Sequence, residues 1–431
     1  MATGISTRIA KKVFLKTLAG LRGGCLEVVC PELTYRFGHM AEEETDEAKD
    51  GLHAVVAVHN ERFFKRALLA GDVGVGEAYM AGDWSTPDLV QVVRLAVRNL
   101  DQLENSNRLF TLFRRMVDLF EHRRNRNTES GSRRNIAYHY DLGNDFYRLF
   151  LDRSLTYSCG YYERVDDTLE EAQIRKFDRI CRKLQLSSQD HVLEIGTGWG
   201  GFAAYAAENY GCRVTTTTIS QQQHDYAQRL FSESRAGGRI QLLFEDYRKL
   251  SGQFDKIVSI EMFEAVGYDN YDAYFGACNR LLRPDGSLLL QTITIQEAKF
   301  AQYREQSDWI KKYIFPGAEL ASVVGIQQSL ARISGAGTTR GGTGMQLFQM
   351  EDIGIHYALT LREWRRRFLE RVGEARKLGF DARFIRMWDY YLAYCEGAFR
   401  ERYISNAQLV IGKITSENRL LNEPVMESSR Q

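Results

Sequence analysis

The sequence predicts an α/β protein with a doubly wound, mostly parallel sheet, preceded by a smaller mixed α/β domain. One observation is an apolar strand that runs into a glycine-rich turn, Val192-Leu-Glu-Ile-Gly-Thr-Gly-Trp-Gly-Gly201. Strand and helix patterns then alternate as far as residue 295. The chain has 431 residues and is 44% apolar, so it can bury a large core and is more typical of two domains than of one.

The first hundred residues carry the patterns of the small domain, which we expect to end near Asn99. Residues 8–21 place apolar side chains at helical spacing with basic side chains between them, which predicts a basic amphipathic helix. Such a helix either packs on its own domain or lies on a membrane surface, and the pattern leaves both open. Short strands are expected over 25–37 and 52–58, and a helix over 63–80.

A basic segment follows this domain. Residues 108–134 hold eight arginines and three acidic residues, although the formal net charge of the whole chain is only +1 and gives no sign of nucleic-acid binding. The segment is either a solvated connector or a cationic surface for anionic lipid heads, where each Lys or Arg contributes about 1 kcal/mol. We therefore expect a domain over 1–105, a basic helical linker over 106–135 and a catalytic domain over 136–431.

The expected elements of the catalytic domain alternate as a doubly wound sheet requires. After the first strand, strands are expected over 213–219, 240–244, 254–260 and 287–295, with helices over 222–235 and 271–282. Further helices are expected over 308–313, 361–378 and 381–402, and a mobile glycine-rich loop over 334–344.

Cysteine usage and apolar runs indicate the compartment. Seven scattered cysteines without a Cys-x-x-Cys pair indicate reduced thiols in a cytosolic protein and argue against a zinc site or a disulfide framework. The start of the chain is not a convincing signal peptide, and no stretch approaches the ~20 apolar residues of a membrane span. Any membrane contact is expected to be peripheral, at the inner face of the cell membrane.

The glycine-rich turn predicts a nucleotide-type cofactor site. Its spacing differs from the dinucleotide fingerprint and favours an S-adenosylmethionine methyltransferase over an NAD enzyme, with a ligand-free turn as the remaining alternative. Ligands of such sheets lie beyond the carboxyl ends of the strands, and a carboxylate after the third strand can accept a hydrogen bond from an adenine amino group. The candidate cofactor contacts are Glu194, Gly196, Thr197, Gly198 and Gly200 after the first strand, Thr218, Ile219 and Gln223 after the second, Glu245 and Asp246 after the third, and Glu261 after the fourth.

Five further motifs are specific: Tyr138-His-Tyr-Asp-Leu-Gly-Asn-Asp145, Leu155-Thr-Tyr-Ser-Cys-Gly-Tyr161, Ser259-Ile-Glu-Met-Phe-Glu-Ala-Val-Gly267, Tyr313-Ile-Phe-Pro316 and Glu396-Gly-Ala-Phe-Arg400. With them, residues 136–413 resemble the cyclopropane-fatty-acyl-phospholipid synthase family, which includes the mycolic acid methyltransferases. The resemblance implies a Rossmann-like class I methyltransferase domain. The N-terminal part is similar to the small lipid-binding, sterol-carrier-like domain of the phospholipid enzymes, which the mycolic acid enzymes lack.

The resemblance implies a chemistry and its residues. A cis double bond of a lipid acyl chain attacks the methyl group of S-adenosylmethionine, and a bound bicarbonate ion then removes a proton so that a cyclopropane ring closes. The implied ligands of bicarbonate are Cys159, Glu264, Gln291, the backbone of Ile293, and Tyr357. Tyr157 and Ser158 are implied to contact the cofactor.

Two residues depart from the pattern of the family. Ala265 and Gln291 stand where histidines are usual, and glutamine can donate a hydrogen bond but cannot carry a proton as histidine can. We expect a cyclopropane synthase that acts on unsaturated acyl chains of membrane phospholipids at an anionic membrane surface. The alternatives are a methyl- or methylene-branching enzyme, a methyltransferase for a soluble small molecule, and a lipid-binding protein with a decayed site. A homodimer is expected only by analogy.

Overall fold

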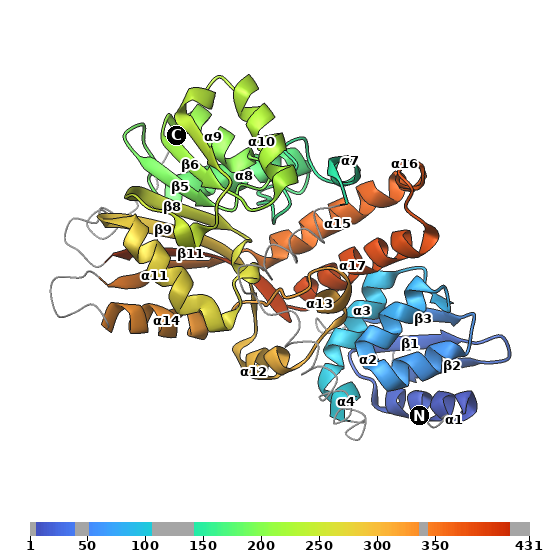
Figure 1. Cartoon of the computed structure of the whole chain (residues 1–431). Helices are drawn as coiled ribbons and strands as arrows, with labels where there is room; N and C mark the ends of the chain where they lie inside the picture. Colours follow the sequence, from blue (N-terminus) through green and yellow to red (C-terminus); the bar gives the residue numbers. More distant parts are fainter. Residues whose placement is uncertain (1–5, 39–50, 106–141, 336–343, 414–431) are drawn as a thin grey trace. The chain divides into compact units, whose positions relative to one another are not determined.

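The computed structural model describes residues 6–38, 51–105, 142–335 and 344–413 (Figure 1). The basic linker expected over 106–135 and most of the loop expected over 334–344 lie outside these residues. Contacts between Cα atoms divide the chain into two compact units. The first contains 1–125, 301–316 and 358–404, and the second contains 126–300, 317–357 and 405–431. This division differs from the expected one, because two segments after residue 300 belong with the N-terminal part.

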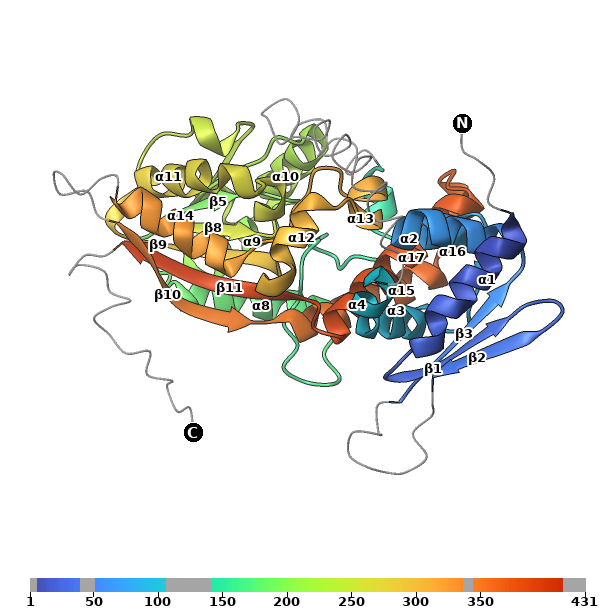
Figure 2. The same ribbon diagram turned by 90° about the horizontal axis from the view of Figure 1, so that it is seen from below.

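The second unit is built on a seven-stranded sheet with the order β10-β11-β9-β8-β5-β6-β7. Its strands are β5 (His191–Ile195), β6 (Arg213–Thr217), β7 (Ile240–Leu243), β8 (Phe254–Ile260), β9 (Leu282–Ile295), β10 (Met345–Asp352) and β11 (Ile404–Lys413). The five strands from β9 to β7 pair in parallel, as expected. Figure 2 shows the antiparallel pair β10 and β11, which the sequence patterns did not predict.

Helices cover both faces of this sheet, which confirms the doubly wound prediction (Figure 1). Successive residues of a strand point to opposite faces. Accordingly Leu193 belongs to one apolar core, with α11 (Tyr271–Leu281) and α14 (Val323–Gly335). Its neighbour Val192 belongs to the other. That second core is formed with α8 (Leu169–Lys183), α9 (Gly201–Tyr210) and α10 (Gln221–Glu233). The short helices of this unit are α7 (Asn144–Tyr147), η3 (Gly237–Arg239), η4 (Tyr247–Lys249), η5 (Phe263–Ala265) and η6 (Tyr268–Asn270), and α12 (Glu297–Glu305) is divided between the two units.

The first unit contains a four-stranded sheet with the order β2-β1-β3-β4. Its strands are β1 (Gly24–Val29), β2 (Thr34–Gly38), β3 (Leu52–Val58) and β4 (Trp84–Ser85). Its helices are α1 (Thr7–Thr17), η1 (Leu18–Gly20), α2 (Arg62–Met80), α3 (Leu89–Arg98), α4 (Leu100–Asn105), α13 (Trp309–Tyr313), α16 (Val372–Lys377) and α17 (Ala382–Arg400). Helix α15 (Gly354–Glu370) is shared by the two units.

The late segments are tied into the first unit by specific contacts. Helix α17 packs against α3 and α2. Tyr79 donates a hydrogen bond of 2.6 Å to Asp389, and Tyr313 donates one of 2.6 Å to Glu77. The motif around Tyr313 therefore has a structural role in this unit. Among the described residues, no helix is long and apolar enough to cross a membrane.

Candidate active site

The glycine-rich turn between β5 and α9 leaves part of the main chain uncovered by side chains. Gly196, Gly198 and Gly200 have φ values of 101°, 53° and 95°, which side-chain-bearing residues rarely adopt. A Cβ added at Gly200 would lie 2.8 Å from the ring of Phe231, so close packing excludes it. A Cβ at Gly198 would meet no described atom within 4 Å. The turn is therefore packed on one side and open at Gly198, where a ligand can approach the main chain.

Polar side chains at the carboxyl ends of β5 and β6 hold this turn in place. Glu194 is 3% exposed and accepts a hydrogen bond of 2.6 Å from Thr216. Burial raises the pKa of Glu194 to about 8. Thr216 also lies 2.7 Å from the hydroxyl of Thr197. After β6, Thr218 donates a hydrogen bond of 2.9 Å to Gln223, while Ile219 is partly exposed.

The two acidic residues after β7 lie in different environments. Glu245 is exposed. Asp246 is 3% exposed, and its two oxygens accept hydrogen bonds of 2.8 and 2.6 Å from Arg248. Burial alone would raise the pKa of Asp246, but the hydrogen bonds from Arg248 lower it. The Asp246 carboxylate thus forms an ion pair with the Arg248 guanidinium.

An aromatic cluster lies beside the glycine-rich turn. Trp199 donates a hydrogen bond of 2.8 Å from its indole nitrogen to Asn144, which belongs to the first specific motif. The Tyr147 ring lies 5.0 Å from the Trp199 ring and 5.5 Å from the ring of Tyr157. Residues 138–141 of the motif lie outside the described residues.

Glu261 is the centre of the polar site. It follows β8, and its side chain accepts four hydrogen bonds. Its Oε1 accepts from the backbone N–H of Cys159 at 3.0 Å, from Gln291 at 2.8 Å and from Asn406 at 2.6 Å. Its Oε2 accepts from the hydroxyl of Tyr357 at 2.7 Å. Glu261 was predicted to contact the cofactor, and this stays a prediction. The structure joins its side chain to three of the residues predicted to hold bicarbonate.

Glu264 forms a second carboxyl group one turn later. Its Oε1 accepts hydrogen bonds of 2.6 Å from the backbone N–H of Ile293 and 3.0 Å from Thr292. Its Oε2 is buried and has no hydrogen-bond partner within the described part of the chain. Burial, and then the charge of Glu261, raise the pKa of Glu264 to about 8. The site therefore holds two carboxyl groups, and Glu264 retains its proton at neutral pH.

The residues predicted to bind bicarbonate do not fit that ion in this chain. The N–H of Cys159 and the side chains of Gln291 and Tyr357 donate to Glu261. The N–H of Ile293 donates to Glu264. Four of the five groups that the resemblance assigns to an anion thus donate to a carboxyl group of the protein itself. The fifth is Glu264, which is one of those carboxyl groups.

Lys176 is a site residue that the sequence reading missed. It lies on α8, is 0% exposed and donates a hydrogen bond of 2.6 Å to the hydroxyl of Ser158. Burial lowers the pKa of Lys176 to about 8, and the negative charge of Glu261 opposes that shift. The sequence could have indicated it, because Lys176 is four residues from both Ala172 and Ile180 and so lies on the apolar face of the helix. A lysine in that position requires a polar partner.

A chain of amide groups orients Gln291. The side-chain oxygen of Gln291 accepts a hydrogen bond of 3.0 Å from Gln408, whose own oxygen accepts one of 2.7 Å from Lys183. Lys183 also contacts Glu351 at 2.5 Å. Because an ammonium group can only donate, Lys183 fixes the direction of both amides. The amide nitrogen of Gln291 is thereby turned toward Glu261.

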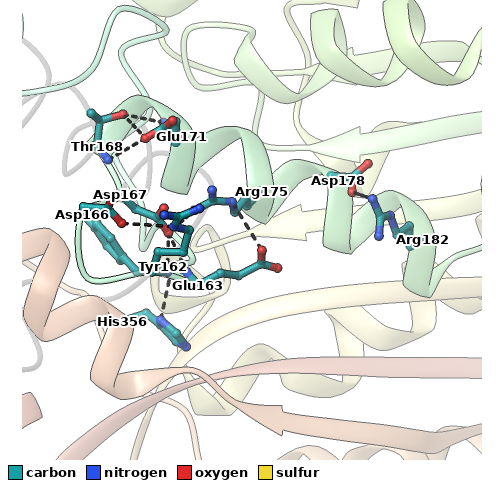
Figure 3. A network of polar contacts seen from close by, with 11 residues as sticks. Tyr162, Glu163, Asp166, Asp167, Thr168, Glu171, Arg175, Asp178, Arg182 and His356 are labelled. Carbon is teal, nitrogen blue, oxygen red and sulfur yellow. Dashed lines mark hydrogen bonds and ion pairs between the residues drawn. The ribbon is translucent and has the colours of Figure 1, made fainter. Parts of the chain in front are cut away.

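The segment after the Cys159 motif is held by a polar network, drawn in Figure 3. The backbone N–H of Tyr162 donates a hydrogen bond of 3.2 Å to His356, which stacks on Tyr161 with ring centroids 4.3 Å apart. Asp167 pairs with Arg175 of α8. Burial lowers the pKa of His356. These contacts join the Cys159 segment to α8 and to the start of α15.

Comparisons with known proteins show the family of this chain. A family model described as mycolic acid cyclopropane synthetase matches residues 127–409. Tuberculostearic acid methyltransferase UfaA1 of Mycobacterium tuberculosis is 38% identical over 341 residues, which cover 78% of this chain and 77% of the relative. Cyclopropane-fatty-acyl-phospholipid synthase of Escherichia coli K12 is 39% identical over 369 residues, which cover 84% of this chain and 88% of the relative.

Solved structures of cyclopropane synthases are also similar to this chain. The cyclopropane synthase MmaA2 from Mycobacterium tuberculosis matches with a TM-score of 0.59 at 32% identity, covering 65% of this chain and 98% of that chain. Mycolic acid cyclopropane synthase CmaA1, complexed with SAH and CTAB, matches with a TM-score of 0.58 at 33% identity and the same coverage. The 369 residues aligned with the Escherichia coli relative exceed the segment 127–409, so that likeness extends into the N-terminal part.

Proposed function

The chain belongs to the mycolic acid cyclopropane synthetase family and is an S-adenosylmethionine-dependent methyltransferase of lipids, and we propose that it forms cyclopropane rings at cis double bonds of phospholipid acyl chains. The observation that carries the proposal is the pairing of an open glycine-rich turn with a desolvated carboxyl site after β8. The phospholipid substrate is supported by the Escherichia coli relative, whose likeness includes the N-terminal part.

The proposed reaction divides the work between the two parts of the site. S-adenosylmethionine supplies a methyl carbon, to which the π electrons of the double bond form a bond while the carbon–sulfur bond breaks, leaving a positive charge on the acyl chain. The backbone around Gly198 would hold the cofactor, with Thr218 and Gln223 beyond the next strand. The aromatic rings of Tyr147 and Tyr157 would exclude water and stabilise positive charge.

A second candidate is a methyltransferase that leaves an open branch instead of a ring. It is favoured by the relative that is named a tuberculostearic acid methyltransferase. It is also favoured by Gln291, which cannot carry a proton as a histidine would. The two candidates share the first step and differ in how the cation on the acyl chain loses its proton.

The enzyme is proposed to reach its substrate by docking on an anionic membrane surface. Helix α1 supports this step, since Arg8, Lys12 and Lys16 are exposed and spaced at i, i+4 and i+8, which places them on one face. The neighbouring Ile9 is 58% exposed.

The test is mass spectrometry of lipids from a host that lacks its own cyclopropane synthase, expresses this chain and is fed methyl-deuterated methionine. We expect phospholipid acyl chains that carry two deuterium atoms on an added ring carbon. Labelled chains with an alkene would favour the branching candidate, because that product reacts with ozone whereas a cyclopropane does not. No labelled phospholipid in cells that contain folded protein would overturn the proposed substrate class.

A further inference from the structure

We propose that Glu261 is the general base of this enzyme, built into the chain in place of a bound bicarbonate ion. This inference rests on the proposed function and deepens it, since it assigns the group that takes the proton. It begins from the fact that the donors expected around an anion surround the Glu261 carboxylate instead.

The backbone of Glu261 indicates a functional position. Its φ is +51°, in the left-handed region where a residue with a Cβ is disfavoured by about 1–2 kcal/mol. Such strain persists only where the surroundings enforce it, and it clusters at functional sites. Here the N–H of Glu261 donates a hydrogen bond of 2.8 Å to the carbonyl of Gln291, which holds the strained residue at the end of β8.

The donors around Glu261 come from separate parts of the second unit. Gln291 is on β9, Asn406 on β11, Tyr357 on α15, and Cys159 in the segment before α8. Groups on rigid elements hold a carboxylate in one position, as a base requires. Three donors meet Oε1 and one meets Oε2. Oε2 therefore has fewer partners than Oε1 among the described residues and keeps a lone pair that can accept a proton.

The charges around the site suit one ionised carboxylate and no further anion. Lys176 is a buried cation whose electrostatic influence reaches Glu261. Glu264 lies close enough to Glu261 for the charge of Glu261 to raise its pKa, and its buried Oε2 lacks a protein partner among the described residues. Because Glu264 stays protonated at neutral pH, Glu261 and Lys176 balance each other. A bicarbonate ion would add a negative charge at a site whose four expected N–H and O–H donors already meet Glu261 and Glu264.

The proposed step is balanced. The Glu261 carboxylate removes a proton from the methyl group that has been added to the acyl chain. The electron pair of that C–H bond forms a bond to the cationic carbon and closes the ring, which leaves the chain neutral. The protonated Glu261 then releases its proton to solvent when the product leaves.

The experiment compares dependence on bicarbonate in purified full-length protein, assayed on vesicles of monounsaturated phospholipid. Wild-type turnover should be the same in buffer freed of carbon dioxide and in buffer with added sodium bicarbonate. Glu261→Gln keeps the shape of the side chain and should lower kcat by about 10²–10⁴-fold with an unchanged Kd for S-adenosylmethionine. Glu233→Gln is the matched control on an exposed site and should keep full turnover.

Glu261→Gly gives the sharpest result, because glycine adopts φ +51° freely and its lack of a side chain exposes the four donors. This variant should be inactive without bicarbonate and regain turnover as bicarbonate is added. It should also bind ¹³C-bicarbonate in an NMR titration in which the wild type does not.

Three outcomes would overturn the inference: a wild-type enzyme that needs bicarbonate, a Glu261→Gln variant with full turnover, or a folded Glu261→Gly variant that bicarbonate neither binds nor rescues. Each leaves methyl transfer to phospholipid intact as a wild-type activity. Wild-type protein that binds the cofactor but never methylates phospholipid would instead contradict the proposed function.

Discussion

Glu264 is a carboxyl group whose ionisation the fold opposes. Its ordinary pKa is 4.5, and burial followed by the charge of Glu261 raises that pKa to about 8 in the folded protein. Between these values the folded state holds a proton that the unfolded chain has released. The free energy of unfolding therefore falls as the pH rises from about 4.5 to about 8, by an amount on the order of a few kcal/mol.

Glu264→Gln should remove this pH dependence. The glutamine oxygen can still accept from Ile293 and Thr292, while its amide replaces the protonated oxygen. We expect the variant to lose less stability than the wild type between pH 5 and pH 8, measured by urea unfolding at each pH. Lys176 affects stability in another pH range. Because its pKa is lowered, the free energy of unfolding rises with pH only from about pH 8 toward pH 10.5. Parallel pH curves for wild type and variant would contradict the prediction, and Glu233→Gln serves as the control.

Single residues show how far the site could be predicted. The glycine-rich turn and the Cys159, Glu264, Gln291 and Tyr357 set follow from motifs, and the structure brings that set together around β8 and β9. The hydrogen bonds of Glu261 to Cys159, Gln291 and Tyr357 did not follow, because a carboxylate after a strand is equally compatible with other partners. Its partners depend on the direction of the side chain, which the positive φ of Glu261 helps to set and which no sequence pattern indicates.

At the level of elements, the site depends on donors that are oriented by their neighbours. Gln291 on β9 can present either its oxygen or its nitrogen to Glu261, and the amide of Gln408 on β11 decides which. Lys183 on α8 in turn orients Gln408. Residues on three elements thus determine which end of the Gln291 amide points toward Glu261.

Gln408→Glu should reverse the orientation of the Gln291 amide. A carboxylate at 408 still pairs with Lys183 but needs a donor from Gln291, which turns the oxygen of Gln291 toward Glu261. We expect kcat to fall by about ten-fold or more, since a hydrogen bond to a charged group is worth about 1.5–3 kcal/mol. The Kd for S-adenosylmethionine, measured by calorimetry, should not change. Gln346→Glu makes the same exchange at an exposed position of β10. An equal fall in kcat there would argue against orientation of Gln291 by Gln408.

The elements also show what periodicity cannot predict. The strand expected over 254–260 coincides with β8, and the helix expected over 381–402 contains α17. The pair β10 and β11 was missed, although β11 reads as a long apolar strand, because it follows a run of helices and no turn joins it to its partner. An apolar pattern gives the period of an element but not the element against which it packs.

The whole molecule is organised by contacts between distant parts of the sequence. Arg94 and Arg98 of α3 each contact Glu401 at 2.6 Å, just beyond the end of α17, and Gly397 of α17 approaches Val93 so closely that a Cβ would lie 2.6 Å from it. The N-terminal unit is therefore completed by residues 358–404. Their place in the sequence assigns residues 358–404 to the catalytic domain, because no local sequence pattern shows that they pack with the N-terminal residues.

In the N-terminal unit one face of the basic helix α1 packs on its own domain, and contact of another face with a membrane stays a prediction. Phe14 packs with its ring centroid 5.3 Å from that of Phe63 and 5.7 Å from that of Phe64, so one face of the helix is fixed to its own domain. Lys11 pairs with Glu61 at 2.9 Å. The packed face does not use the row formed by Arg8, Lys12 and Lys16, which remains exposed.

Reversing the charge of Arg8, Lys12 and Lys16 to glutamate should abolish docking on anionic membranes. Three cations at about 1 kcal/mol each amount to about 100-fold in vesicle affinity, before the added repulsion. Flotation with anionic vesicles should lose the variant at low salt, whereas turnover on detergent-dispersed phospholipid should match that of the wild type, since the row lies away from the packed face of α1. The control reverses Arg376, Lys377 and Arg383, which are exposed on α16 and α17 of the same unit. Equal flotation of wild type and the α1 variant would show that the membrane is reached through another surface, because the charge row would then contribute nothing to binding.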